Sequence, residues 1–195
     1  MLDTTQTERH TLSILVDNEP GVLARVVGLF SGRGYNIESL TVSEVDEQRH
    51  TSRISVVTSG TPMVIEQINK LLARLVPVHV VEDLTTGPSH VERELALVKI
   101  VNNGSQRVEA LRVADSFRAR TLDSTLNSFV FEVTGNSSKI SAFIKLMESL
   151  GKVEIARTGV CGMTRGNTID LIDACLLYTS PSPRDRSLSR MPSSA

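Results

Sequence analysis

One six-element pattern of apolar and polar residues occurs twice along the 195-residue chain, and this repeat limits the fold more than any other feature. The first copy predicts strand, helix, strand, strand, helix and strand over residues 10–17, 21–31, 36–45, 51–58, 62–75 and 78–84. The second copy predicts the same order over residues 93–101, 105–117, 120–125, 128–134, 137–150 and 152–159. The chain therefore contains two βαββαβ units in tandem.

Each unit predicts an antiparallel sheet of four strands with two helices on one face, the α+β arrangement called ferredoxin-like. In the first strand, Leu12 and Ile14 alternate with polar neighbours, as expected when one face of a strand lies in a core. We assign residues 9–85 to the first domain, 86–91 to a linker and 92–166 to a similar C-terminal domain.

Several strands are apolar on both faces, most clearly over residues 78–81 and 95–100. A sheet with helices on only one face would expose half of these side chains to water. We therefore expect a partner sheet or a second copy of the chain to cover the other face. A homodimer formed through the first domain is the prediction.

The loop between the first strand and the first helix reads NEPGVL, residues 18–23. Gly21 has no Cβ, so a ligand can approach its backbone closely. The backbone amides of Gly21, Val22 and Leu23 have no partner inside the helix, and together they suit a small anion such as a carboxylate. The alternative is an ordinary helix start in which Asn18 serves as a turn or cap residue.

The composition favours a soluble cytoplasmic protein. The chain has 40% hydrophobic and 22% charged residues and a formal net charge of −1. It has no apolar run of membrane-spanning length, and residues 1–9 lack an apolar signal segment. Acidic and basic residues are mixed, without the basic cluster that nucleic-acid binding requires.

Residues 175–195 differ from everything before them. The segment CLLYTSPSPRDRSLSRMPSSA is rich in Ser, Pro and Arg and has no periodicity. It is similar to the translation of a sequencing adapter. We therefore interpret it as a non-native tail and leave it out of the predicted fold.

Nothing in the sequence indicates a catalytic or metal centre. The 4 histidines show no metal-ligand spacing, and residues 32–34, although rich in glycine, follow a helix and predict its end instead of a phosphate loop. No pair of carboxylates suggests acid and base catalysis. Phe129 and Phe131 have the spacing that stacks RNA bases in other proteins, but without basic neighbours they are better explained as core residues.

The run 18–40, NEPGVLARVVGLFSGRGYNIESL, resembles the ACT domain of acetohydroxyacid synthase (acetolactate synthase) small subunits. The segments HVERELALVKI at 90–100, RTG at 157–159 and TRG at 164–166 match the same family, so the resemblance covers roughly residues 9–166. It implies that the first unit is an ACT domain and the second an ACT-like domain.

The same resemblance implies a non-catalytic regulatory subunit. Such a subunit activates a separate large catalytic subunit and confers feedback inhibition by valine in branched-chain amino acid (valine, leucine and isoleucine) biosynthesis. Thiamine diphosphate, Mg and FAD are implied in the catalytic partner only, and no cofactor in this chain.

The family's effector site is carried over to six positions: Asn18, Gly21, Val22, Leu23, Asn36 and Ile37. The first four match the segment that holds the effector's carboxylate and side chain. Asn36 and Ile37 match the segment supplied by the neighbouring subunit, where backbone carbonyl groups face an ammonium group and an apolar surface meets an aliphatic side chain. On sequence alone, Asn36 is equally well explained as a turn residue after Gly34.

Three other classes of function remain as alternatives. A free-standing amino-acid sensor would share the first domain but would not need the HVERELALVKI segment. An independent enzyme would need a reactive centre, and a nucleic-acid-binding module would need a basic sheet face.

Overall fold

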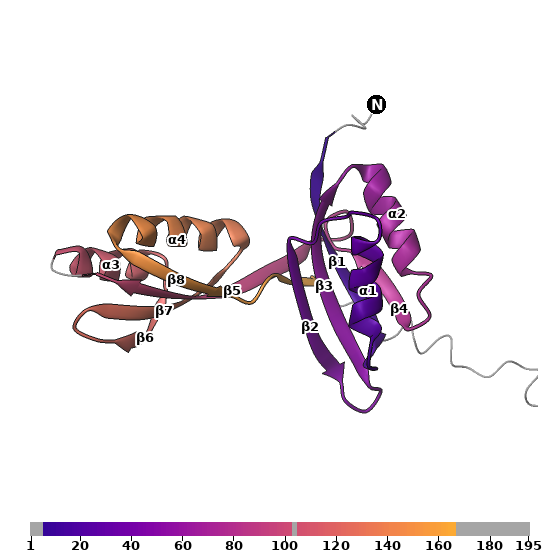
Figure 1. The fold of residues 1–195 in the computed structure, drawn as a ribbon, viewed down its shortest axis with the longest axis horizontal. Coiled ribbons are helices and arrows are strands. Elements are labelled where there is room, and N and C mark those ends of the chain that lie inside the picture. Colours follow the sequence, from indigo (N-terminus) through magenta and orange to yellow (C-terminus); the bar gives the residue numbers. More distant parts are fainter. Residues whose placement is uncertain (1–5, 103–104, 167–195) are drawn as a thin grey trace, which may run out of the picture. The chain divides into compact units, whose positions relative to one another are not determined.

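The computed structural model describes residues 6–102 and 105–166, which fold into two βαββαβ units (Figure 1). The first unit consists of β1 (Glu8–Asp17), α1 (Val22–Ser31), β2 (Ser39–Asp46), β3 (Thr51–Gly60), α2 (Pro62–Leu72) and β4 (Val78–Asp83). The second consists of β5 (His90–Val101), α3 (Ser105–Ser116), β6 (Arg120–Ser124), β7 (Ser128–Gly135), α4 (Ser137–Leu150) and β8 (Lys152–Arg157), followed by β9 (Cys161–Thr164). The predicted α+β class with two ferredoxin-like units is confirmed. The interpretation of residues 175–195 lies outside the described residues.

The first sheet has the strand order β2-β3-β1-β4, and its neighbouring strands are antiparallel. Both helices of the unit lie on the same face of this sheet (Figure 1). Leu12, Ile14 and Val16 of β1 point to that face and pack with Val26 and Phe30 of α1. All five are at most 1% exposed, so the alternation read from the sequence marks the core face correctly.

A left-handed glycine ends α1. Gly34 has φ +71°, and the N–H of Tyr35 reaches back to the carbonyl of Phe30 at 3.0 Å. A left-handed residue after the helix with such a return hydrogen bond is a common C-terminal stop. Residues 32–34 therefore end a helix, as predicted.

The second sheet has the order β6-β7-β5-β8, with α3 and α4 on one face. Phe129 and Phe131 are 2% and 0% exposed in its core, which confirms that these rings pack inside the unit. At the start of α4 the side chain of Asn136 accepts a hydrogen bond from the N–H of Lys139 at 3.0 Å and so caps the helix.

β9 was not predicted, and it changes the description of β5. His90 to Arg93 pair with β9, whereas residues 94–101 pair with β7 and β8. β5 therefore begins inside the segment expected to be a linker. The single strand expected over 152–159 ends at Arg157, because Gly159 turns the chain at φ +89°.

Coverage of the second face differs between the two sheets. Thr11, Ser13 and Leu15 of β1, on the face opposite the helices, are at most 2% exposed. Part of this cover is β9 of the same chain, since a Cβ on Gly162 would lie 3.5 Å from Thr11 Cγ2. In β5, by contrast, Leu97 is 36% exposed, so its face remains open in the single chain.

Candidate functional site

The loop before α1 has the conformation that the predicted carboxylate site requires. Gly21 is the N-cap residue and has φ +86°, a left-handed conformation that residues with a Cβ adopt at a cost. No side chain caps the helix. Because the N-cap residue is Gly21, the alternative in which Asn18 caps α1 is wrong. Asn18 lies in the turn before the helix, where its backbone N–H donates to the carbonyl of His50 at 2.6 Å.

The space in front of this helix start is open. Among residues 6–102 and 105–166, apart from Gly21 and its two chain neighbours, no atom lies within 4 Å of the position that a Cβ on Gly21 would occupy. The amide of Val22 makes a long turn bond of 3.3 Å to the carbonyl of Glu19, while helix geometry leaves the amides of Leu23 and Ala24 without partners inside the helix. The first turn also contains no acidic residue, so the positive end of the helix is not neutralised there.

The side chains of this loop have different surroundings. Val22 is 3% exposed and packs in the first core, which leaves only its backbone for a ligand. Leu23 is 40% exposed, and Asn18 is exposed. The loop therefore offers mainly backbone N–H groups, with one apolar side chain beside them.

Asn36 and Ile37 precede β2, which starts at Ser39 instead of at residue 36 as expected. The Asn36 carbonyl accepts a hydrogen bond of 2.7 Å from the hydroxyl of Thr58. A carbonyl oxygen has two lone pairs, so one acceptor site remains for an ammonium group. Asn36 is exposed, while Ile37 is partly buried against the first core.

A single chain does not bring the two halves of the predicted site together. The loop at 18–21 follows Asp17, which pairs with Thr51 at one end of the sheet. Asn36 is bonded to Thr58, which pairs with His10 near the other end. The extended chain from His10 to Asp17 spans roughly 20 Å. Residues of both halves can meet only if a second copy supplies one half.

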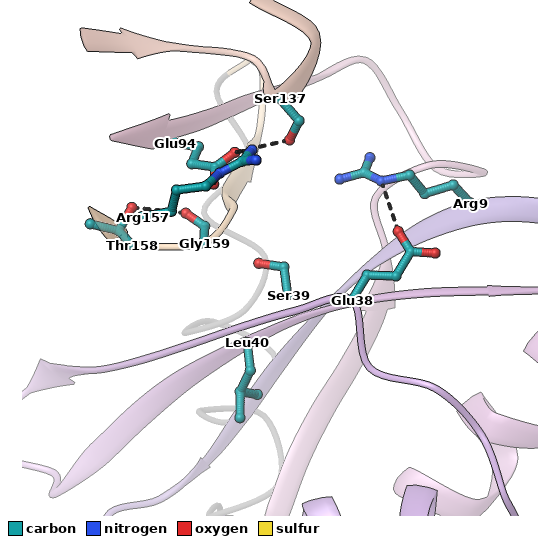
Figure 2. Close-up of a pocket in the computed structure, with 9 residues that line it drawn as sticks. All are labelled: Arg9, Glu38, Ser39, Leu40, Glu94, Ser137, Arg157, Thr158 and Gly159. Atoms are coloured by element: carbon teal, nitrogen blue, oxygen red, sulfur yellow. Dashed lines mark hydrogen bonds and ion pairs between the residues drawn. The ribbon is translucent and has the colours of Figure 1, made fainter. Parts of the chain in front are cut away.

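A cavity of about 460 Å³ lies elsewhere in the molecule, where β1 and the start of β2 face β5, α4 and the connection after β8 (Figure 2). It is lined by Arg9, Glu38, Ser39, Leu40, Glu94, Ser137, Arg157, Thr158 and Gly159. Seven of these residues lie in sequence segments that match the family, Glu38, Ser39, Leu40, Glu94 and residues 157–159, but the sequence assigned no role to any of them.

An ion pair between a buried carboxylate and a more exposed arginine forms one wall of this cavity. The Glu94 side chain is 4% exposed and accepts two hydrogen bonds from Arg157, Nε to Oε1 at 2.6 Å and Nη2 to Oε2 at 2.7 Å. The hydroxyl of Ser137 donates to Oε2 at 3.1 Å. The hydrogen bonds from Arg157 lower the pKa of the Glu94 carboxyl and outweigh its desolvation, and the same bonds raise the pKa of Arg157.

Arg9 lies on the opposite side of the cavity, beside Glu38 (Figure 2), and it also contacts Glu92. Its Nε lies 3.5 Å from Glu38 Oε2 and its Nη1 lies 3.5 Å from Glu92 Oε2. The charged groups of the cavity thus pair with one another. This arrangement is suited to holding segments of the chain together.

A sequence signal for the buried carboxylate of Glu94 did exist. Glu94 has the same parity in β5 as Ala96, Val98 and Ile100, all of which face the core. An acidic side chain on the buried face of a strand requires a cation or several hydrogen bonds. The identity of that cation is not a local property, because Arg157 lies 63 residues away.

The structure shows neither a metal cluster nor a membrane helix in the part of the chain that it describes. No group of three or more His, Cys, Asp or Glu side chains there is placed to hold a metal ion. No helix there is long and apolar enough to cross a membrane.

The first unit combines a βαββαβ fold with an uncapped helix start, and its sequence identifies it as an ACT domain. A family model described as the AHAS small subunit-like ACT domain matches residues 12–80, and one described as the small subunit of acetolactate synthase matches residues 93–166. The chain therefore belongs to the family of acetolactate synthase small subunits.

Individual relatives agree with this family. The probable acetolactate synthase small subunit of Archaeoglobus fulgidus is 46% identical over 159 residues, 82% of this chain and 98% of the relative. The acetolactate synthase isozyme 3 small subunit of Escherichia coli K12 is 46% identical over 162 residues, 83% of this chain and 98% of the relative. The crystal structure of the small subunit from Thermotoga maritima has a TM-score of 0.74 at 38% identity and covers 83% of this chain and 99% of that one.

Proposed function

We propose that this chain activates a large catalytic subunit of acetolactate synthase and makes it sensitive to feedback inhibition by valine. The observation that carries the proposal is the uncapped start of α1 at Gly21, which presents free backbone N–H groups to an open space. Thiamine diphosphate, Mg and FAD belong to the catalytic partner in this proposal. The present chain contributes no catalytic residue.

The effector binds by its two charged ends. Its carboxylate accepts hydrogen bonds from the amides at the start of α1, near Gly21 and Leu23, where the helix dipole favours a negative charge. Its ammonium group donates to the free lone pair of the Asn36 carbonyl. Its aliphatic side chain packs against Ile37, which is partly buried at the edge of the first core.

Two copies of the chain are needed to assemble this site, and the edge of the first sheet offers a way to join them. β2 is an edge strand with two exposed apolar side chains, Val42 at 45% and Val45 at 41%. An unpaired edge of this kind is a template for another strand. Antiparallel pairing of two β2 strands about a twofold axis would form one continuous sheet.

The register explains why this dimer completes the site. Asp46, at the end of β2, pairs with Thr51, which also pairs with Asp17 at the end of β1. The loop containing Gly21 therefore lies near the Asp46 end of its own β2. Antiparallel pairing brings the Ser39 end of the other β2, and with it the other copy's Asn36, toward this loop.

Effector binding at such a site fixes the orientation of two chains, so it favours one arrangement of the dimer. If the catalytic subunit binds the two arrangements with different free energies, the effector changes its activity. This coupling is reciprocal, and the catalytic subunit must alter effector affinity by the same factor.

The experiment is to measure acetolactate formation by a matching catalytic subunit, with and without the full chain, across a titration of valine. We expect stimulation by the chain and its reversal by valine. Parallel titrations with leucine and isoleucine rank the effectors. Absence of stimulation, together with absence of a complex in size-exclusion chromatography, would contradict the proposal and favour a free-standing sensor.

A further inference from the structure

The segment that leaves β8 is bonded to β2 two residues beyond the predicted effector segment at 36–37. We propose that Ser39 and Thr41 are coupling residues, which transmit effector occupancy from that segment to the second unit through Gly159 and Val160. This inference rests on the proposed function, and it adds the route by which the second unit senses the effector.

Gly159 contacts β2 closely because it has no side chain. Its φ is +89°, and a Cβ added there would lie 2.6 Å from Ser39 Oγ and 3.1 Å from Thr41 Cγ2. Both the backbone conformation and the lack of space exclude a side chain. The backbone at Gly159 therefore lies directly against the side chains of Ser39 and Thr41 in β2.

Val160 forms two hydrogen bonds to the same strand. Its N–H donates to Ser39 Oγ at 2.8 Å, and its carbonyl accepts from Thr41 Oγ1 at 3.1 Å. Val160 is 2% exposed. Water does not readily replace these bonds in a buried position, so a shift of β2 must move Val160 or break them.

The residues before Gly159 attach this segment to β5. The N–H of Thr158 donates to the carbonyl of Leu95 at 3.0 Å, and the Thr158 hydroxyl accepts from the N–H of Leu95 at 3.2 Å. Arg157 binds Glu94 through both carboxylate oxygens. β2 is thus linked to β5 through a segment of four consecutive residues, 157–160.

The link continues into α4. Ser137, the first residue of α4, donates to the Glu94 carboxylate at 3.1 Å. A movement that begins at Asn36 and Ile37 therefore reaches a strand and a helix of the second unit through bonded groups only. Such a chain of contacts carries coupling if it has two arrangements, which a functional test can establish.

The test compares three forms of the full chain: wild type, Ser39→Ala/Thr41→Val, which removes both hydroxyls, and Ser39→Thr/Thr41→Ser, which keeps them. Ser43→Ala is the matched control, because Ser43 is an exposed residue of the same strand. For each form we would measure valine affinity by calorimetry, stimulation of the catalytic subunit without valine, and residual activity at saturating valine.

We expect the form without hydroxyls to bind valine within about threefold of wild type and to stimulate normally. Its ratio of uninhibited to inhibited activity should fall by about tenfold. The free energy of two neutral hydrogen bonds corresponds to a factor of about this size. The forms that keep both hydroxyls should behave as wild type. If the double variant does not fold, Thr41→Val alone removes one bond and should give a smaller fall of the same kind.

Two results would overturn the inference. Full valine inhibition of the form without hydroxyls would show that the bonds carry no coupling. If the form without hydroxyls lost both valine binding and valine inhibition, Ser39 and Thr41 would belong to the binding site itself. A wild-type chain that neither binds valine nor stimulates would instead contradict the proposed function, and this inference with it.

Discussion

Gly21 combines two requirements at one residue, a left-handed backbone and an open approach to the helix start. An Asp at this position would place a negative charge where the effector carboxylate is proposed to bind. We expect Gly21→Asp to stimulate the catalytic subunit but to need at least about tenfold more valine for half inhibition. A valine titration of acetolactate formation measures this.

Gly21→Asn is the matched control for that variant. Asn and Asp tolerate the left-handed region about equally well and are nearly the same size, so the two variants differ mainly in charge. Asn should retain much more valine sensitivity than Asp. Equal loss of sensitivity in both variants would point to the Cβ or the backbone instead of the charge.

Glu94 predicts a dependence of stability on pH. Because Arg157 lowers its pKa in the folded chain, the carboxylate stabilises the fold above the ordinary value of 4.5, and this contribution is lost as the pH falls through the lowered pKa. At pH 7, Glu94→Gln should reduce the free energy of unfolding by about 2 kcal/mol, the order of a hydrogen bond to a charged group.

The measurement is urea unfolding of wild type and Glu94→Gln between pH 7 and pH 3. The difference between them should shrink toward the acid end. Glu109→Gln is the control, since Glu109 forms a pair with Arg112 on the surface, where the Glu109 side chain is 51% exposed. A difference for Glu94→Gln that stays constant with pH would contradict the assignment.

At the scale of elements, the exposed edge of β2 is the feature that the proposed dimer depends on. A lysine on an edge strand opposes pairing with another strand, because its charge would have to be desolvated. We expect Val42→Lys to weaken dimerisation by at least about tenfold and to lower valine affinity with it. Sedimentation velocity over a range of concentrations gives the dissociation constant.

Met63→Lys serves as the control for this variant. Met63 is an apolar residue of α2 that is 69% exposed, and it lies outside β2. It should leave the dimer unchanged. Dimerisation of Val42→Lys at wild-type strength would rule out the β2 edge as the interface.

Local sequence patterns predict most of the helices and strands. They fail where contacts with residues distant in the sequence determine whether a strand forms or where it begins. The strands and helices of both units follow from alternation, helical spacing and caps. β9 has four residues and includes Gly162, so it lacks a pattern of its own and forms only by pairing with His90 to Arg93. β2 begins later than expected, after a segment whose Asn36 carbonyl is bonded to Thr58, 22 residues along the chain.

The candidate site divides in the same way. The open helix start at Gly21 depends on a few neighbouring residues, and the sequence shows it. The hydrogen bond of Ser39 to Val160 joins residues 121 positions apart, so no local pattern reveals it. Asn36 and Gly21 lie at opposite ends of one sheet, so the proposed site requires two molecules, which no pattern within one sequence can show.

For the whole molecule, an effector that binds only the folded form must raise its stability. At a valine concentration 100 times the dissociation constant the gain is about 2.7 kcal/mol, which should raise the unfolding temperature by several degrees. Valinamide has the same side chain and ammonium group but no carboxylate, so it should give no comparable shift. Calorimetric unfolding with each compound tests this.

The Gly21→Asp variant completes the comparison. At the same valine concentration its stabilisation should fall from about 2.7 to about 1.4 kcal/mol or less, the value for binding that is at least about tenfold weaker. Equal stabilisation by valine and valinamide would show that the carboxylate is not what the helix start recognises.

β5 has a consequence for how such a protein can change over evolutionary time. Its first four residues pair with β9 and the rest with β7 and β8, so one continuous strand takes part in both sets of pairings. Inserting or deleting a single residue near Arg93 would turn every later side chain to the opposite face. A free linker between tandem domains tolerates such length changes, whereas a paired strand at the start of the second unit restricts them.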